Sequence, residues 1–156
     1  MDDDDKKQAQ AARNKVYRLL KFRPRSVAEV RAKLIEKKFA QNIVEETIDY
    51  FKEYGFLDDK SFARGWIRSR LNRPFGTKRI HYELIQKGVD RDIIKEELDE
   101  ALCQYCENDI VFDLAKRRME KYRHLEIQKA KQRLIGYLNR RGFNQQAIIK
   151  AIKKIT

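Results

Sequence analysis

Apolar residues recur along this chain in a pattern that repeats three times. Residues 29–48 align with residues 79–98 and then with residues 133–152, at offsets of 50 and 54. Apolar side chains coincide at five positions of this alignment: Val30, Ile80 and Leu134; Leu34, Leu84 and Leu138; Phe39, Val89 and Phe143; Val44, Ile94 and Ile148; Ile48, Leu98 and Ile152. Five triplets in register indicate an internal repeat of about 50 residues.

Each copy of the pattern predicts two helices separated by a turn. The first two apolar positions lie four residues apart, as do the last two, which is the spacing of one helix face. Gly88 and Gly142 occupy the same slot between the pairs, where a helix C-cap in the left-handed region favours glycine. Asp90 and Asn144 follow as N-caps of the next helix.

A third helix is predicted upstream of each pair, at about 8–22, 59–72 and 108–122. Ser26 and Glu29 form a capping box at the start of the helix that follows the first of these. The fold class is therefore all-α, with three tandem three-helix repeats forming an elongated, curved array in which neighbours bury each other's apolar faces. The predicted organisation is a tag-like segment at 1–7 and repeats at 8–57, 58–107 and 108–156.

The charge of the chain favours a polyanionic partner. The formal net charge is +12. The opening MDDDDKK resembles an engineered protease-recognition site, and without Asp2 to Asp5 and Lys6 the balance is 12 + 4 − 1 = +15. Nucleic acid is the first candidate partner and an anionic membrane the second. No apolar run approaches the roughly 20 residues that span a bilayer, and two cysteines do not make a disulfide framework, so we expect a cytoplasmic, reduced protein. Its exposed charge and its repeats favour a monomer.

Two adjacent carboxylates, Asp58 and Asp59, are the first candidates for chemistry. Gly55 is predicted just past a helix end, with Phe51 and Phe56 in hydrophobic contact across it. Asp58 then becomes the N-cap of the next helix and Asp59 lies in its first turn, where it meets the positive helix end. A two-metal or acid–base site would need more converging carboxylates or histidines. We therefore interpret the pair as capping residues.

The other chemical signals are weak. Cys103 and Cys106 have zinc-ligand spacing, but a structural zinc site needs four ligands, and His81 and His124 lie in different repeats. No glycine-rich phosphate loop, Ser/His/Asp set or HExxH motif is present. The sequence predicts no enzyme, no metal and no cofactor.

Arginines on the helix predicted at 59–72 are better candidates for binding. Phe62, Ala63, Trp66, Ile67 and Leu71 form one apolar arc of this helix. Arg64 and Arg68 lie outside the arc, where they are either binding residues or part of a solvated face. Arg70 falls inside that arc, which favours an ion pair with Glu83 or Asp58 over a ligand contact.

The last repeat is the most basic part of the chain. Residues 108–156 hold thirteen Lys and Arg against four acids, a local charge of +9. Cationic helices of this kind bind phosphate backbones without reading sequence. The candidate binding residues are Arg64, Arg68, Arg73, Lys78, Arg79, Lys87, Lys116, Arg117, Arg118, Lys121, Arg140 and Arg141.

Four stretches of the sequence cover all three repeats in order: LLKFRPRSVAEVRAKLIEKKF, YGFLDDKSFARGWIRSRL, FGTKRIHYELIQKGV and YLNRRGFNQQAI. Together they resemble the RecX family, the bacterial regulatory proteins of the RecA recombinase. The chain departs from the family pattern at Lys38, where the first repeat of the family usually has glycine.

The resemblance implies a non-enzymatic modulator that binds RecA filaments on single-stranded DNA and mostly inhibits ATP hydrolysis, filament extension and strand exchange. It also implies some association with DNA itself, single-stranded or duplex, without sequence preference. The alternatives are a free-standing nucleic-acid-binding regulator with helix-turn-helix-like units and, with least support, a nuclease or phosphatase that depends on Asp58 or Asp59.

Overall fold

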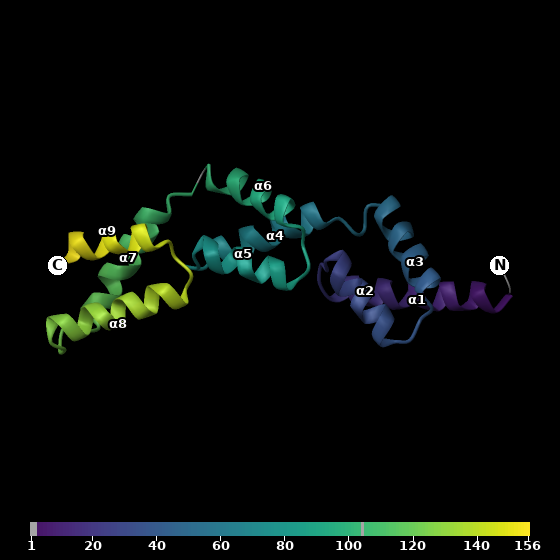
Figure 1. Cartoon of the computed structure of the whole chain (residues 1–156), viewed down its shortest axis with the longest axis horizontal. Coiled ribbons are helices and arrows are strands. Elements are labelled where there is room, and N and C mark those ends of the chain that lie inside the picture. The colour runs from purple at the N-terminus through teal and green to yellow at the C-terminus, as the bar shows by residue number, and fades with distance from the viewer. Residues whose placement is uncertain (1–2, 104) are drawn as a thin grey trace. The chain divides into compact units, whose positions relative to one another are not determined.

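The protein is described by a computed structural model, which covers residues 3–103 and 105–156. Its described residues form helices and connecting turns, with no strand among them (Figure 1). The helices are α1 (Asp3–Phe22), α2 (Val27–Glu36), α3 (Gln41–Glu53), α4 (Asp59–Leu71), α5 (Thr77–Gln86), α6 (Arg91–Leu102), α7 (Glu107–Glu120), α8 (Ile127–Arg140) and α9 (Gln145–Ile155). The predicted all-α class is confirmed.

The apolar repeat corresponds to the hydrophobic core. Thirteen of the fifteen aligned side chains are buried. The other two, Phe39 and Ile152, are partly buried and pack against the cores formed by α1–α3 and by α7–α9 respectively. The five apolar positions of each repeat therefore correspond to side chains of the hydrophobic core.

The predicted helix ends are confirmed in detail. Gly55, Gly88 and Gly142 have φ values of +73°, +72° and +79°. At each of them the helix closes as a Schellman motif; after α3, the Gly55 N–H donates to the Lys52 carbonyl at 3.0 Å and the Phe56 N–H donates to the Phe51 carbonyl at 2.9 Å.

The predicted helix starts are also present. Ser26 and Glu29 form the complete capping box of α2. Asp58, Asp90 and Asn144 each accept the backbone N–H two residues further on, at 2.9, 2.8 and 2.9 Å. The same side-chain cap therefore opens α4, α6 and α9.

The first helix differs from its prediction. α1 begins at Asp3 rather than near residue 8. Carboxylates are stabilising in the first turn of a helix, where they meet the positive end of the helix dipole. The acidic segment that precedes the first repeat in the sequence therefore extends α1 by a turn or more.

The chain divides into two compact units that do not follow the sequence repeats. Unit 1 is the chain up to Ala63 together with Leu84–Ile94, and unit 2 is Arg64–Glu83 together with Lys95–Thr156. The turn between α5 and α6 thus belongs with the first repeat, and the α4–α5 connector with the third. In each unit, the turn between the second and third helices of one repeat is hydrogen-bonded to the connector between the first and second helices of the repeat before it.

Candidate functional site

The first inter-repeat contact lies in unit 1, where the α5–α6 turn meets the α1–α2 connector. The Ser26 hydroxyl is fully buried and donates to the Lys87 carbonyl at 2.5 Å. Next to it, a Cβ atom at Gly88 would come within 2.4 Å of the Ala28 Cβ. The absence of a side chain at Gly88 therefore allows the turn to approach α2 this closely.

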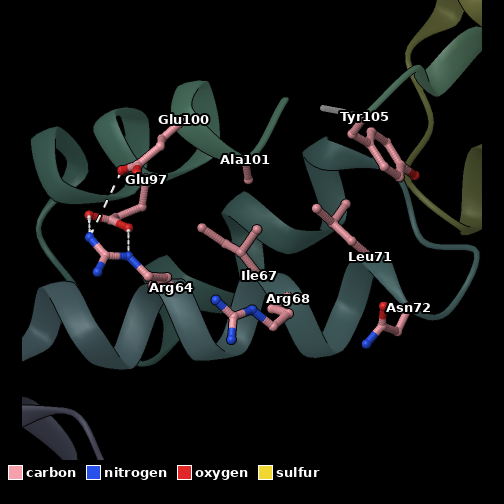
Figure 2. A pocket seen from close by; sticks show the side chains of 9 residues that line it. All are labelled: Arg64, Ile67, Arg68, Leu71, Asn72, Glu97, Glu100, Ala101 and Tyr105. Atoms are coloured by element: carbon pink, nitrogen blue, oxygen red, sulfur yellow. Dashed lines mark hydrogen bonds and ion pairs between the residues drawn. The ribbon is translucent and has the colours of Figure 1, made fainter. Parts of the chain in front are cut away.

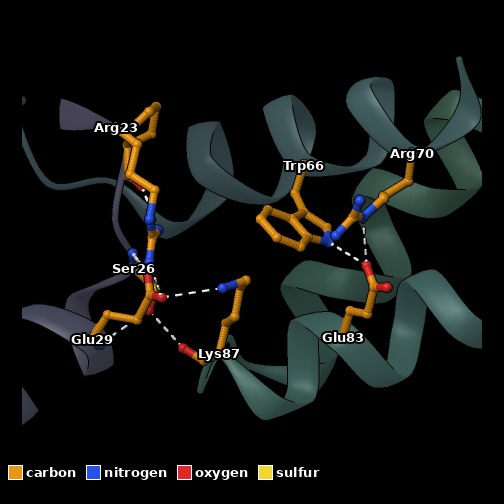
Figure 3. A network of polar contacts seen from close by, with 8 residues as sticks. Arg23, Ser26, Glu29, Trp66, Arg70, Glu83 and Lys87 are labelled. Carbon is orange, nitrogen blue, oxygen red and sulfur yellow. Dashed lines mark hydrogen bonds and ion pairs between the residues drawn. The ribbon is translucent and has the colours of Figure 1, made fainter. Parts of the chain in front are cut away.

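The partly buried carboxylate of Glu29 joins the two sides of the same contact through hydrogen bonds and ion pairs. Glu29 accepts hydrogen bonds from the guanidinium of Arg23 at 2.8 and 3.1 Å and from Lys87 Nζ at 3.1 Å (Figure 3). Burial alone would raise the pKa of Glu29, but these bonds and the one from the Ser26 N–H lower it to about 2. The ammonium of Lys87, a candidate binding residue in the sequence, is thus engaged by Glu29.

Asp59 has a role that its position in the sequence does not reveal. Its carboxylate accepts the Val27 backbone N–H, the first of α2, at 2.8 Å. Burial raises the pKa of Asp59 although this hydrogen bond acts to lower it. The two aspartates therefore cap two different helices. Asp58 caps the start of α4, and Asp59 caps the start of α2.

The second inter-repeat contact lies in unit 2, where the α8–α9 turn meets the α4–α5 connector. The Gly76 N–H donates to the Arg141 carbonyl at 2.8 Å, and the Lys78 N–H donates to the Gly142 carbonyl at 3.2 Å. A Cβ atom at Gly142 would lie 2.4 Å from the Arg79 Cβ, and one at Gly76 would overlap the Gly142 backbone. Two backbones therefore meet here with no side chain between them.

Guanidinium groups and aromatic rings stack beside the second contact. The Phe75 ring lies 4.1 Å from the guanidinium carbon of Arg79 and 5.5 Å from that of Arg141. The Tyr137 ring in turn lies 5.0 Å from Arg141 and 4.4 Å from Arg118. Three of the candidate arginines are thus held in cation–π contacts, which fix their positions.

Arg70 pairs with Glu83, one of the two partners predicted from the sequence. Arg70 Nε lies 2.6 Å from the Glu83 carboxylate, which also accepts from the Trp66 indole at 3.0 Å (Figure 3). The same carboxylate accepts from Arg79 Nε at 3.1 Å. Burial acts to raise the pKa of Glu83, but these three donors lower it. The prediction that Arg70 forms an ion pair is confirmed.

A cleft of about 510 Å³ opens over the second contact, and we call it the basic cleft. Its lining residues come from α5, α8 and the α8–α9 turn: Lys78, Arg79, Tyr82, Glu83, Asn139, Arg140, Gly142 and Phe143. Three cations face one carboxylate, and that carboxylate is already bound by Arg70 and Arg79. Lys78 and Arg140 are exposed and form no ion pair within the described residues. The cleft therefore suits an anion such as a backbone phosphate.

A second cleft, of about 400 Å³, lies between α4 and α6 within unit 2 (Figure 2). Ile67, Leu71 and Ala101 contribute apolar surface to it. Arg64 binds the buried Glu97 through two hydrogen bonds, at 2.9 and 3.1 Å. Arg68 lines the same cleft and is exposed. The two arginines that the sequence grouped together thus have different surroundings.

The remaining candidates lie on unit 2. Arg73 is exposed in the α4–α5 connector, and Lys116, Arg117 and Lys121 are exposed on or just after α7. The structure brings together Lys78, Arg79, Arg140 and Arg141 at the second contact. Sequence reasoning missed Phe75, Tyr82 and Asn139 there; the only signal was Phe75 within the basic connector NRPFG.

The cysteines and acids that the structure describes form no metal site. Cys103 and Cys106 are free and exposed. No group of three or more His, Cys, Asp or Glu side chains arranged to hold a metal occurs in the part of the chain that the structure covers. Within the same residues, no helix is long and apolar enough to cross a membrane.

Comparison with protein families matches the chain in three consecutive segments. The first, second and third three-helix domains of RecX match residues 12–51, 58–98 and 107–152. The chain belongs to the RecX family. The predicted resemblance and the predicted tandem three-helix repeats are both confirmed.

Individual RecX proteins align over most of the chain. The "Regulatory protein RecX" of Mycolicibacterium smegmatis is 33% identical over 147 residues, which cover 91% of this chain and 78% of the relative. That of Chlorobium phaeobacteroides is 32% identical and aligns over 99% of this chain and 97% of its own length. For the relative from Clostridium beijerinckii, 32% identical, the alignment covers 81% of this chain but only 60% of the relative.

Solved RecX structures share the fold. The crystal structure of RecX from Lactobacillus salivarius superposes with a TM-score of 0.82 at 22% identity and covers 96% of this chain and 97% of that chain. A second RecX crystal structure gives a TM-score of 0.80 at 23% identity, with coverage of 94% and 73%. The chain thus has the fold of the solved RecX structures.

Proposed function

We propose that this RecX-family chain binds RecA filaments on single-stranded DNA and restrains RecA's ATP hydrolysis, filament extension and strand exchange in recombination and DNA repair. The observation that carries the proposal is the match of all three RecX domains, in order, over residues 12–152. RecX is a family of regulatory proteins, and the proposed action is regulatory rather than catalytic.

The basic cleft supports a direct contact with nucleic acid. Lys78 and Arg140 project into it from two different helices, and backbone hydrogen bonds of the second contact fix the two helices relative to each other within unit 2. Such a contact neutralises phosphates and carries no base information. Binding should therefore be indifferent to sequence and sensitive to salt.

Two variants test the cleft. Lys78→Ala combined with Arg140→Ala should weaken binding to a single-stranded oligonucleotide and flatten the plot of log K against log salt by about 0.7 per lost phosphate contact. Lys37→Ala, which removes an exposed cation of unit 1, is the control. An unchanged slope in the double variant would remove the cleft from the proposal.

Binding to the filament itself is measured with labelled oligonucleotides coated with RecA. The chain should sediment with the filament at near-stoichiometric amounts, and bind bare duplex weakly and without sequence preference. Tight, sequence-dependent binding to duplex DNA, with no association to RecA, would instead support a free-standing nucleic-acid regulator.

A further inference from the structure

Unit 1 exposes a cluster of aromatic rings that its own fold leaves uncovered. Tyr17 from α1, Tyr50 from α3 and Phe56 from the turn after α3 pack against the fully buried Phe51. Tyr54, the C-cap residue of α3, packs against Tyr50. The exposed fractions are 43% for Tyr17, 63% for Tyr54 and 56% for Phe56. We call these four exposed or half-exposed rings the aromatic patch.

The rings of the patch are held in place by one another. Tyr17 packs against Phe51 at 4.8 Å and against Phe56 at 6.1 Å between ring centroids, in edge-to-face geometry. Tyr50 lies 4.7 Å from Tyr54, and the hydroxyls of Tyr17 and Tyr50 are 3.3 Å apart. Rigid aromatic side chains of this kind lose little conformational entropy on binding, and they dominate the energetics of protein interfaces.

The charges around the patch discriminate between partners. Helix α3, which supplies Tyr50, carries four acids (Glu45, Glu46, Asp49 and Glu53) against Lys52, a net charge of −3. Arg31 of α2 binds Glu45 and Arg13 of α1 pairs with Glu46, whereas Glu53 lies three residues after Tyr50 and so shares its face. On α1, Lys21 lies four residues after Tyr17 and so shares its face. Arg13, four residues before Tyr17, is paired with Glu46 and stacked on the Tyr50 ring, so Lys21 is the cation of this rim that faces a partner. A polyanion would be repelled by α3, whereas a protein surface of mixed charge would meet both rims.

We infer that the aromatic patch is a protein-docking surface, and that its partner presents an apolar side chain flanked by a carboxylate toward α1 and a cation toward α3. An aromatic centre within a rim of mixed charge is the usual anatomy of a protein interface. The inference rests on the proposed function, in which that partner is the RecA filament. It assigns protein contact to unit 1 and leaves phosphate contact to the basic cleft of unit 2.

The test compares Tyr54→Ser with Phe22→Ser. Phe22 is 84% exposed and lies about 140° around α1 from Tyr17, away from the patch, so it is a matched aromatic control. Two quantities are measured for each variant: the concentration that half-inhibits DNA-dependent ATP hydrolysis by RecA, and the Kd for a single-stranded oligonucleotide without RecA.

Tyr54→Ser should raise the half-inhibitory concentration by about tenfold or more and leave the oligonucleotide Kd unchanged. Phe22→Ser should change neither. A higher oligonucleotide Kd in Tyr54→Ser would mean that the patch stacks nucleobases. Unchanged values of both quantities would mean that the patch contacts neither RecA nor DNA. Either result overturns the inference, while inhibition of RecA by the wild type would still uphold the proposed function. Wild type without any effect on RecA overturns both.

A photo-crosslinking residue at position 54 gives a second readout that does not depend on loss of affinity. Irradiation of the assembled complex should join the chain to RecA and not to the oligonucleotide. Adducts with the oligonucleotide alone would contradict the inference even if Tyr54→Ser proved unstable.

Discussion

Lys38 takes the position that glycine occupies in the other two repeats, and its surroundings explain why. Its φ is +61°, and it closes α2 with the same pair of hydrogen bonds that close α5 and α8. Gly88 and Gly142 meet a second demand, because a Cβ atom at either would strike a neighbouring residue at 2.4 Å. At Lys38 only the left-handed backbone conformation favours glycine, and a lysine adopts that conformation at a cost of about 1–2 kcal/mol.

Lys38→Gly should therefore stabilise the protein by about 0.5–1 kcal/mol, because the left-handed strain is relieved at some cost in chain entropy. Lys37→Gly, one residue earlier and at φ −82°, should destabilise it by about 0.5–1 kcal/mol. Urea unfolding of both variants checks the prediction. A loss of stability in Lys38→Gly would contradict the assignment of strain to this residue.

Gly88→Ala should cost more than Gly55→Ala, although both glycines have the same φ to within a degree. A Cβ at Gly55 meets nothing within 4 Å, so the cost there is conformational strain alone, about 1–2 kcal/mol. At Gly88 the clash with Ala28 adds an overpacking term of about 1–3 kcal/mol.

The rescue variant isolates that clash. Adding Ala28→Gly to Gly88→Ala should recover about 1 kcal/mol or more relative to the sum of the single changes, as measured by a double-mutant cycle in urea. Strict additivity would show that the close approach of α2 and the α5–α6 turn does not persist in solution.

At the scale of helices, charged groups decide how the turn and connector of unit 1 are held. Glu29 lies on α2 and binds one cation from the preceding connector and one from the α5–α6 turn. In unit 2 the corresponding contact relies on backbone hydrogen bonds and on arginines stacked on Phe75. The two contacts share their geometry and differ in chemistry, so acid should affect the first more than the second.

The pKa of Glu29, about 2 in the folded protein, lies below its ordinary value near 4.3. A carboxyl with a depressed folded pKa contributes stability above its unfolded pKa, and that stability is lost as the pH falls toward the folded value. Between pH 6 and pH 2, Glu29 should account for a loss of at most about 3 kcal/mol. Glu29→Gln should flatten this dependence of stability on pH in denaturant titrations. Glu53→Gln, an exposed change on α3 of the same unit, should leave the dependence in place.

Arg64 and Arg68 show how helix packing separates two similar residues. Arg64→Ala leaves the carboxylate of Glu97, whose side chain is 1% exposed, without its bidentate guanidinium. The expected loss of stability is about 1–3 kcal/mol. Arg68→Ala, one turn further along α4, should change stability by less than about 0.5 kcal/mol. Equal melting temperatures for the two variants would contradict the structural role of Arg64.

For the whole molecule, the sequence was informative about local structure and less so about long-range pairing. The helices, their caps and the buried positions follow from spacing within about ten residues, and the structure confirms them. The pairing of Arg64 with Glu97 and of Lys87 with Glu29 joins residues 33 and 58 positions apart, which no local pattern encodes. Asp59 shows the same limit, because its capping of α2 depends on a helix 32 residues earlier.

The division of the chain into two compact units could not be predicted from local sequence patterns either. The contacts that set it join the turn of one repeat to the connector of another. The predicted repeat boundaries at 57/58 and 107/108 stay predictions, as does the binding role of the twelve candidate cations. Their charge is visible in the sequence, whereas the partners that engage Lys87, Arg64, Arg79 and Arg141 are visible only in the fold.

Restraint of RecA by this chain is measured most directly as ATP hydrolysis by RecA on single-stranded DNA while the chain is added in increasing amounts. Hydrolysis and filament extension should fall as the chain approaches stoichiometry with the filament, and the fall should weaken as salt rises. Hydrolysis and assembly that stay constant up to and beyond stoichiometric amounts would contradict the proposed function.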